Sequence, residues 1–346
     1  MQTFDFRSDT TTHPTEKMRQ AMASAKVGDD VYGEDPTVNA LEQKAAEILS
    51  KERGLYVTSG TMGNLLAVLA HCARGEEAIM GTQGHTFLHE AGGVSAVGGV
   101  VIHTIPNQAD GTLALTDLEN ALRNPEDAHE PISKLVIIEN TQNFCGGIPI
   151  SLEYTESVAA FARDHGLLLH LDGARIFNAA VALGLPASKL VAPADSITFC
   201  LSKGLCAPVG SVLCGDAEFI SKARRLRKML GGGMRQAGII AAAGIVALDE
   251  MVDRLAEDHR RAALLEDGLR SMGKVRLTKN SPQTNMVFFK LDESVALSTR
   301  EFLEAMKQEG VLLMDSGPGE YRMVTHNDIT DKGVEVALAA FRKILS

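Results

Sequence analysis

Two mostly apolar segments, each leading into a charged residue, decide the fold class of this chain. They read LLLHLDGAR over residues 167–175 and SITFCLSKG over residues 196–204. Segments of this kind are typical of strands in a parallel sheet that has helices on both faces. Such sheets bind ligands at the carboxyl ends of their strands. We therefore expect Asp172 and Lys203 to share one site.

The surrounding sequence repeats the alternation of strands and helices. Apolar runs that read as strands occupy residues 55–58, 78–80, 100–104, 135–139 and 211–214. Helical periodicity appears between them, for example over residues 152–165 and 218–228. The pattern predicts an α/β fold with a mostly parallel sheet.

The last third of the chain has a different pattern of expected helices and strands. A long alanine-rich helical pattern runs from residue 236 to 272. After it come strand-like residues 285–290, helix-like residues 299–308, strand-like residues 320–324 and a helix from residue 331. We expect a large domain over residues 1–250, which includes the N-terminal segment, and a small α+β domain over residues 251–346.

Composition narrows the class of protein. The formal net charge of −10 argues against a nucleic-acid or anionic-membrane partner, because either needs a basic face. The longest run without a polar side chain has 12 residues (237–248), too few to span a bilayer, and we expect no signal peptide. The five cysteines form no C-x-x-C pair, so we expect reduced thiols in the cytoplasm and no metal site.

A third segment, SGTMGN over residues 59–64, follows a strand and opens an apolar helix. Backbone N–H groups at a helix start attract anions, and a phosphate is the natural occupant. Each segment also has an ordinary interpretation. SGTMGN could be a simple helix cap, Asp172 could form an internal ion pair with Arg175, and Lys203 could lie in a surface loop.

Together the three segments fit pyridoxal phosphate (PLP). This cofactor needs a lysine for its aldehyde, an acid for its pyridine nitrogen and a helix start for its phosphate. Lys203, Asp172 and residues 59–64 supply all three. The G-x-G-x-x-G fingerprint of dinucleotide sites is absent, which weakens an oxidoreductase alternative.

At these residues the sequence resembles the L-threonine aldolases, PLP enzymes of the aspartate-aminotransferase-like fold. The shared motifs run nearly end to end: RSDT (7–10), VGDDVYGEDP (27–36), SGTMGN (59–64), HLDGAR (170–175), LSKG (201–204), APVGS (207–211), GGGMRQAG (231–238) and VTH (324–326). The resemblance implies a large domain with a seven-stranded sheet and a small C-terminal domain. It also implies a homotetramer, built as a dimer of dimers with shared sites.

The resemblance assigns a role to each candidate residue. For the cofactor, these are Lys203 (Schiff base), Asp172 (pyridine nitrogen), Gly60 and Thr61 (phosphate), His85 (ring face) and Arg175. For the substrate, they are Ser8, Arg175 and Arg322 (carboxylate), with His85 and His129 near the hydroxyl. Lys228 and Arg235 would reach the phosphate of a neighbouring subunit.

The expected reaction is retro-aldol cleavage of L-threonine, L-allo-threonine and related β-hydroxy-α-amino acids to glycine and an aldehyde. His85 is the expected base, since a neutral imidazole suits proton transfer near pH 7. Gln142 stands where the family commonly has His, and His89 where it has an aromatic residue, usually Tyr; Phe144 is also atypical. The alternatives are β-elimination or racemisation on the same scaffold, an oxidoreductase, and a binding protein with an inactive site.

Overall fold

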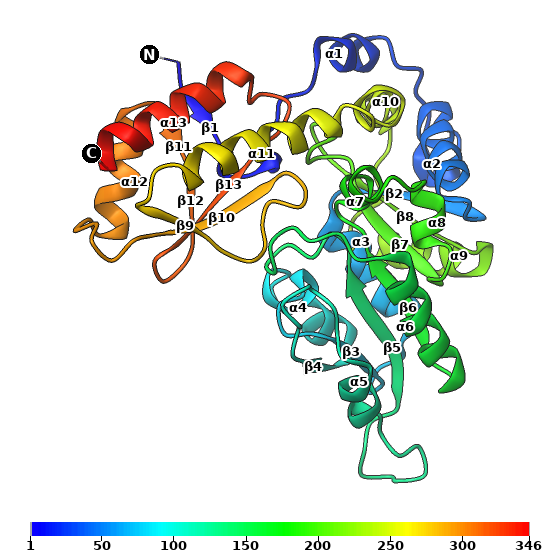
Figure 1. Ribbon diagram of the computed structural model, residues 1–346. Coiled ribbons are helices and arrows are strands. Elements are labelled where there is room, and N and C mark those ends of the chain that lie inside the picture. Colours follow the sequence, from blue (N-terminus) through cyan, green and yellow to red (C-terminus); the bar gives the residue numbers. More distant parts are fainter. Residues whose placement is uncertain (1, 346) are drawn as a thin grey trace.

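The computed structural model describes residues 2–345, which form two lobes (Figure 1). The larger lobe is built on a seven-stranded sheet, and the smaller on a four-stranded antiparallel sheet. In spatial order the large sheet contains β2 (Arg53–Val57), β8 (Ser211–Gly215), β7 (Ser196–Cys200), β6 (Leu168–Asp172), β5 (Ser133–Glu139), β3 (Glu77–Gly81) and β4 (Val101–Ile105). Strand β8 alone runs opposite to the other six strands, which confirms the predicted mostly parallel sheet.

Helices cover both faces of this sheet. Alternate residues of β5 enter different cores, with Val136 and Ile138 on one face and Leu135 and Ile137 on the other. The first face carries α1 (Glu16–Ala23), α2 (Pro36–Leu49), α5 (Leu115–Ala121), α6 (Leu152–Asp164), α7 (Ile176–Leu183), α8 (Ala187–Val191) and α10 (Gly238–Val246). The second face carries α3 (Gly60–His71) and α9 (Ala217–Met229). Burial on both faces explains why these strands read as continuous apolar runs.

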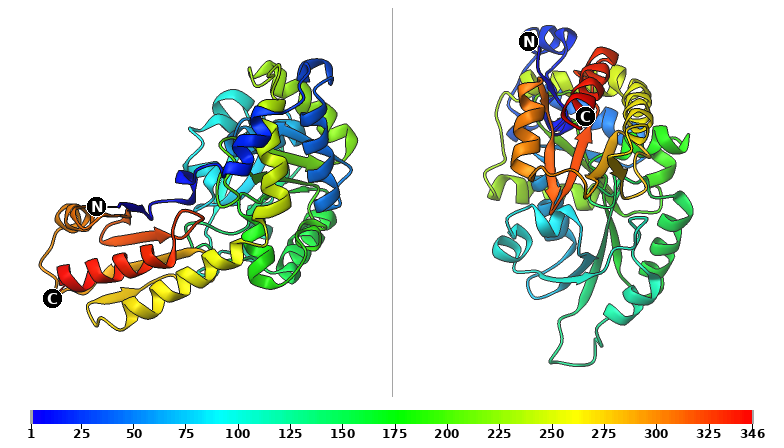
Figure 2. Two further views of the ribbon diagram at one scale, coloured as in Figure 1. Left: turned by 90° about the horizontal axis from the view of Figure 1, so that it is seen from above. Right: turned by 60° about the vertical axis from the view of Figure 1, so that its left-hand side comes forward.

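The alanine-rich pattern of residues 236–272 is not one helix. It divides into α10, a π-helical turn η4 (Ala247–Met251) and α11 (Leu255–Arg270). The first part packs against α1 and α2, whereas α11 packs against α13 (Asp331–Leu345) in the small lobe. The segment therefore changes lobes close to the expected domain boundary (Figure 2).

The small lobe also contains part of the N-terminus. Its sheet has the order β12 (Met314–Gly317), β13 (Glu320–Val324), β10 (Met286–Leu291) and β9 (Val275–Leu277), with α12 (Thr299–Gln308) beside it. Strand β1 (Phe4–Asp5) pairs in parallel with β11 (Val311–Leu312), and Phe4 and Phe6 lie in the core of the small lobe. The first residues thus pack with the small lobe, although the sequence grouped them with the large domain.

Three short helices complete the chain: η1 (Asp9–Thr11), η2 (Asp30–Tyr32) and α4 (His85–Leu88), followed by the π-helical turn η3 (Val94–Gly98). Across residues 2–345, none of the helices has the length and apolar character needed to cross a membrane.

Candidate active site

The carboxyl edge of the large sheet brings the predicted residues together. Asp172 is the last residue of β6 and Glu139 the last of β5, and the two are paired across the sheet. Lys203 follows the end of β7 by three residues. The charges of Asp172 and Lys203 both act on His85, which begins α4. The side chain of Lys203 makes no hydrogen bond or ion pair within residues 2–345, so its amine is available for chemistry.

Asp172 is a buried carboxylate without a cationic partner in the described part of the chain. It is 3% exposed, and it accepts hydrogen bonds from Asn64 Nδ2 (2.8 Å) and from the Ala174 backbone N–H (3.2 Å). The alternative that Asp172 pairs with Arg175 is wrong, because Arg175 pairs with Asp9. A buried carboxylate is costly without a compensating positive charge. A protonated pyridine nitrogen supplies that charge, so the residue fits PLP.

Asp9 is a site residue that the sequence reasoning missed. Arg175 donates to it from Nε (2.7 Å) and Nη2 (2.6 Å), and both side chains are buried. Burial alone raises the pKa of Asp9, but the Arg175 guanidinium outweighs burial and holds the pKa below its usual range. Ser8 caps the short helix η1 that carries Asp9. The motif RSDT marked this segment but gave no signal for the ion pair.

Arg322 is a buried cation without an acidic partner in residues 2–345. It lies on β13 of the small lobe and donates to Asn143 Oδ1 (3.3 Å) and to the Arg7 carbonyl (3.1 Å). Burial, together with the positive charge of Arg175, lowers the pKa of Arg322 to about 10. Two arginines with one buried carboxylate between them leave excess positive charge, which suits a substrate carboxylate. Ser8 directly follows Arg7, whose carbonyl accepts the hydrogen bond from Arg322, so Ser8 lies near the same guanidinium.

His85 is held by two acids that the sequence did not single out. Its Nδ1 lies 2.9 Å from Glu90 Oε1, and its backbone N–H donates to Glu139 Oε2 (2.9 Å). The hydrogen bond that His85 donates to Glu90 raises the pKa of His85, against the effect of burial. Burial and the charge of Asp172 raise the pKa of Glu139 to about 7. A ring nitrogen of His85 and one carboxylate oxygen each of Glu90 and Asp172 all lie within 4.8 Å of one another.

The segment SGTMGN begins α3 as predicted. Ser59 is the N-cap and accepts a hydrogen bond from the Met62 N–H (3.1 Å). Gly60 and Thr61 occupy the first turn, whose N–H groups have no partners within a helix. A Cβ on Gly60 would lie 2.9 Å from Cys200 Sγ of β7, so this approach of helix to strand requires glycine. The helix start therefore offers open donors for the cofactor phosphate.

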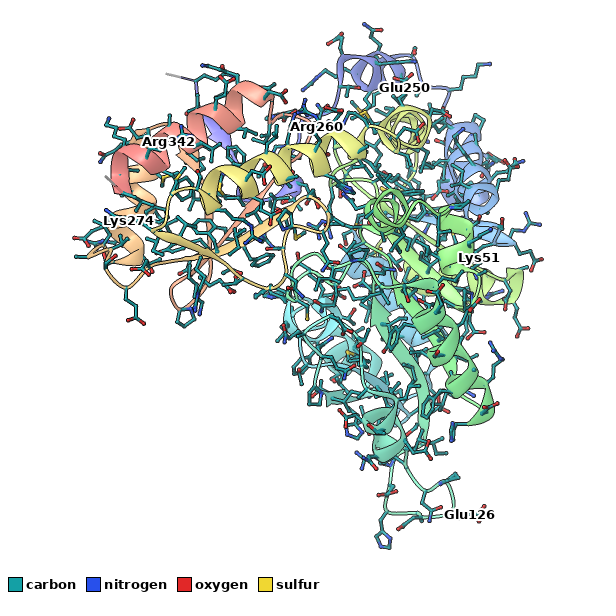
Figure 3. All side chains as sticks on the ribbon, viewed as in Figure 1. Lys51, Glu126, Glu250, Arg260, Lys274 and Arg342 are labelled. Carbon is teal, nitrogen blue, oxygen red and sulfur yellow. The ribbon has the colours of Figure 1, made fainter. Side chains whose placement is uncertain are left out.

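Three predicted residues are not brought to this site within one chain. His129 is 95% exposed and pairs with Asp127 (2.8 Å). It lies in the loop between α5 and β5, whose tip, marked by Glu126, projects from the large lobe (Figure 3). Arg235 is half exposed and pairs with Asp29 (2.8 Å), and Lys228 is exposed at the end of α9.

The two atypical polar residues behave differently. Gln142 is buried and lines the same cavity as His85 and Asp172; it donates to the Gln83 carbonyl (2.9 Å), just before α4, and accepts from the Cys145 N–H (2.7 Å). His89 is exposed, with its ring stacked on Phe144 at 5.0 Å and 5.6 Å from the ring of His85. Only His89 of these two lies open to solvent beside the site.

The chain is similar to known proteins in both sequence and fold. The profile of the beta-eliminating lyase family matches residues 5–293. A probable low-specificity L-threonine aldolase of Arabidopsis thaliana is 48% identical over 99% of this chain and 98% of its own length. A threonine aldolase structure from Leishmania major has a TM-score of 0.83 at 25% identity and covers 99% of each chain.

The fold class is confirmed by a more distant structure. An aspartate aminotransferase from Rhodobacter sphaeroides has a TM-score of 0.73 at 20% identity, covering all of this chain and 93% of its own. At that identity the likeness shows the fold alone. With a family profile over most of its length and a relative nearly half identical from end to end, this chain belongs to the PLP-dependent beta-eliminating lyase family, in its L-threonine aldolase branch.

Proposed function

We propose that this enzyme cleaves L-threonine, L-allo-threonine and related β-hydroxy-α-amino acids to glycine and an aldehyde. The observation that carries the proposal is that Asp172, buried and without a cation among the described residues, and the unpaired amine of Lys203 both lie near enough to His85 for their charges to act on it. PLP, when bound, supplies an aldehyde for the amino group and a protonated ring that accepts the electron pair of the broken Cα–Cβ bond.

The residues of the chain divide the remaining tasks. Lys203 holds the cofactor and Asp172 keeps a proton on its ring nitrogen. Arg322, with Ser8 and Arg175, binds the substrate carboxylate and so fixes the amino acid in one orientation. His85 takes the proton of the β-hydroxyl as the Cα–Cβ bond breaks. The hydroxyl carbon leaves as an aldehyde, and Cα gains a proton to give glycine.

We further infer that the enzyme acts as a homotetramer in which neighbouring copies complete each site. Lys228, Arg235 and His129 do not reach the site of their own chain, and their exposure leaves them available to a neighbour. All five cysteines are buried and none of them forms a disulfide in the described residues, which supports a cytoplasmic location.

Product analysis tests the reaction. The PLP-loaded enzyme is given L-threonine, L-allo-threonine or L-phenylserine in separate assays. We expect equal amounts of glycine and of acetaldehyde or benzaldehyde. Formation of 2-oxobutyrate and ammonia from threonine, without glycine, would instead show β-elimination, and formation of D-threonine or D-allo-threonine would show racemisation at Cα.

A further inference from the structure

Asn64 joins the two acids behind the site. Its Nδ2 donates to Glu90 Oε1 (2.9 Å) and to Asp172 Oδ2 (2.8 Å), one hydrogen bond for each of its two protons. Glu90 Oε1 in turn lies 2.9 Å from His85 Nδ1. Asn64 and Glu90 are 2% and 5% exposed, so neither contributes to a solvated surface. The reaction described above gives neither residue a task.

On the side of Asn64 away from the two acids, each hydrogen bond has only one possible donor and one possible acceptor. Since carboxylates only accept, the Asn64 nitrogen faces them and its oxygen faces His170 Nε2 (3.3 Å), which must carry the proton. His170 Nδ1 then accepts from the Ser196 hydroxyl (2.8 Å), and Ser196 Oγ accepts from His71 Nε2 (2.7 Å). Burial lowers the pKa of His170 to about 3 and of His71 to about 4. Both imidazoles are therefore neutral, as this series of hydrogen bonds requires.

We propose that Glu90 is a positioning residue for His85, and that Asn64 fixes Glu90 and Asp172 side by side. This proposal rests on the proposed function, in which His85 is the base. By accepting a hydrogen bond from Nδ1–H, Glu90 selects the tautomer whose Nε2 carries no proton. His85 Nε2 makes no hydrogen bond within residues 2–345, so it is the nitrogen that can take the proton of the substrate.

The structure offers a nearly isosteric test variant. Glu90 Oε2 is buried and has no hydrogen-bond partner in the described residues. In Glu90→Gln the amide nitrogen can occupy that position, and the amide oxygen keeps the hydrogen bonds with His85 and Asn64. The variant therefore removes the charge and keeps the contacts. Glu90→Leu removes both. Glu77→Gln is the control away from the site: buried Glu77 also lies beside a histidine, His103 Nδ1 at 3.3 Å, although it pairs with Arg123 as well.

The first readout is the pH profile of kcat. Glu90 raises the pKa of His85, so Glu90→Gln is expected to move the acidic limb to lower pH while keeping most of the plateau rate. Glu90→Leu is expected to lower the plateau by about 10²–10⁴-fold, the usual contribution of a positioned base, with little change in KM. Glu77→Gln should leave the acidic limb unchanged.

The second readout does not depend on turnover. Nitrogen NMR of the cofactor-free protein with labelled histidine reports the tautomer of each ring, and a His85→Asn variant assigns the His85 signals. We expect the Nδ1–H tautomer in the wild type and in Glu90→Gln, and a mixture in Glu90→Leu. This measurement remains valid if aldol cleavage itself is not found.

A Glu90→Leu enzyme with wild-type kcat, an unmoved acidic limb and a single Nδ1–H tautomer would overturn the proposal. If Glu90→Leu does not fold, Glu90→Gln decides: an acidic limb that stays at the wild-type pH would show that Glu90 is only a structural residue.

Discussion

Arg175 donates hydrogen bonds to Asp9, at 2.7 and 2.6 Å, and none to Asp172, which lies three residues before it in the sequence. The pair ties the N-terminal segment to the loop after β6, across 166 residues of chain. It also leaves Asp172 without a cation, and the ring nitrogen of the cofactor can supply one.

Removing the acidic partner of this pair should destabilise the fold. Asp9→Ala leaves the Arg175 guanidinium buried and unpaired, which typically costs about 3–5 kcal/mol. Urea unfolding of the two proteins measures the loss. Asp5→Ala is the matched control, because Asp5 and Arg7 form a more exposed pair that contributes about 0–1 kcal/mol. Equal losses in the two variants would contradict the importance of the Asp9–Arg175 pair.

Lys203→Ala is expected to abolish cleavage and to remove the visible absorbance of the lysine-bound cofactor. The reason is that Lys203 supplies the amine that holds the cofactor aldehyde. Spectra and product assays of the purified variant test this, with the exposed Lys332→Ala as control. The assignment of Lys203 fails if the variant keeps both its colour and its turnover.

Arg235 should act on the site of a neighbouring copy. An Arg235→Ala chain and a Lys203→Ala chain are each expected to have low activity. A mixed oligomer can assemble one site without either change, so mixing the two chains should restore part of the activity. Native mass spectrometry shows whether mixed oligomers form. Mixed oligomers without any recovered activity would argue against a shared site.

The residues that sequence reasoning identified share a local signature. Asp172 and Lys203 end apolar strands, and a charge at such a place is visible without any knowledge of tertiary contacts. The helix start at residues 59–64, which we expect to bind the phosphate, is equally visible in the local sequence. The strands and the α3 helix were found for the same reason, since burial on both faces leaves a continuous apolar run.

The missed residues depend on contacts made only in the folded chain. Asp9 meets Arg175 and Glu90 meets Asn64 across long stretches of sequence, and no spacing rule predicts such pairs. Gln142 was expected to affect the substrate pocket; it lines the cavity beside His85, and its effect on specificity stays a prediction. The break between α10 and α11 was missed because the alanine-rich pattern continues through η4.

Neutral burial of His170 should make the fold sensitive to acid. The pKa of His170 falls from its usual 6.5 to about 3 in the folded chain. Between these values the unfolded chain binds a proton that the folded chain does not, so the free energy of unfolding decreases as the pH falls below 6.5. The expected slope is about 1.4 kcal/mol per pH unit.

Comparison with His170→Gln isolates this contribution. The variant lacks the titrating group, so its stability should fall less steeply between pH 6.5 and 4 than that of the wild type. Glu139, whose raised pKa acts in the opposite direction, remains in both proteins and cancels in the comparison. Parallel stability curves from thermal unfolding would show that His170 is not neutral in the fold.

Selectivity should be strict at Cα and weak at Cβ. Arg322 and Ser8 would hold the carboxylate while the cofactor aldehyde takes the amine, which leaves one face for the side chain and requires the L configuration. We expect the β-hydroxyl to be held by few contacts, from His85 and from His129 of a neighbouring copy. Losing one hydrogen bond to a neutral group costs about 0.5–1.5 kcal/mol, or roughly a 2- to 13-fold rate difference.

We therefore expect cleavage of L-threonine and L-allo-threonine, with a preference for the allo form, and activity on phenylserine. His89 is the residue that we expect to change this ratio, because its ring is exposed beside the ring of His85, whereas Gln142 is buried. The test is kcat/KM for both epimers in the wild type and in His89→Tyr. A ratio beyond about a hundredfold, equivalent to about 2.7 kcal/mol, is more than one neutral hydrogen bond supplies. Such a ratio, or cleavage of D-threonine, would mean that further contacts fix the stereochemistry.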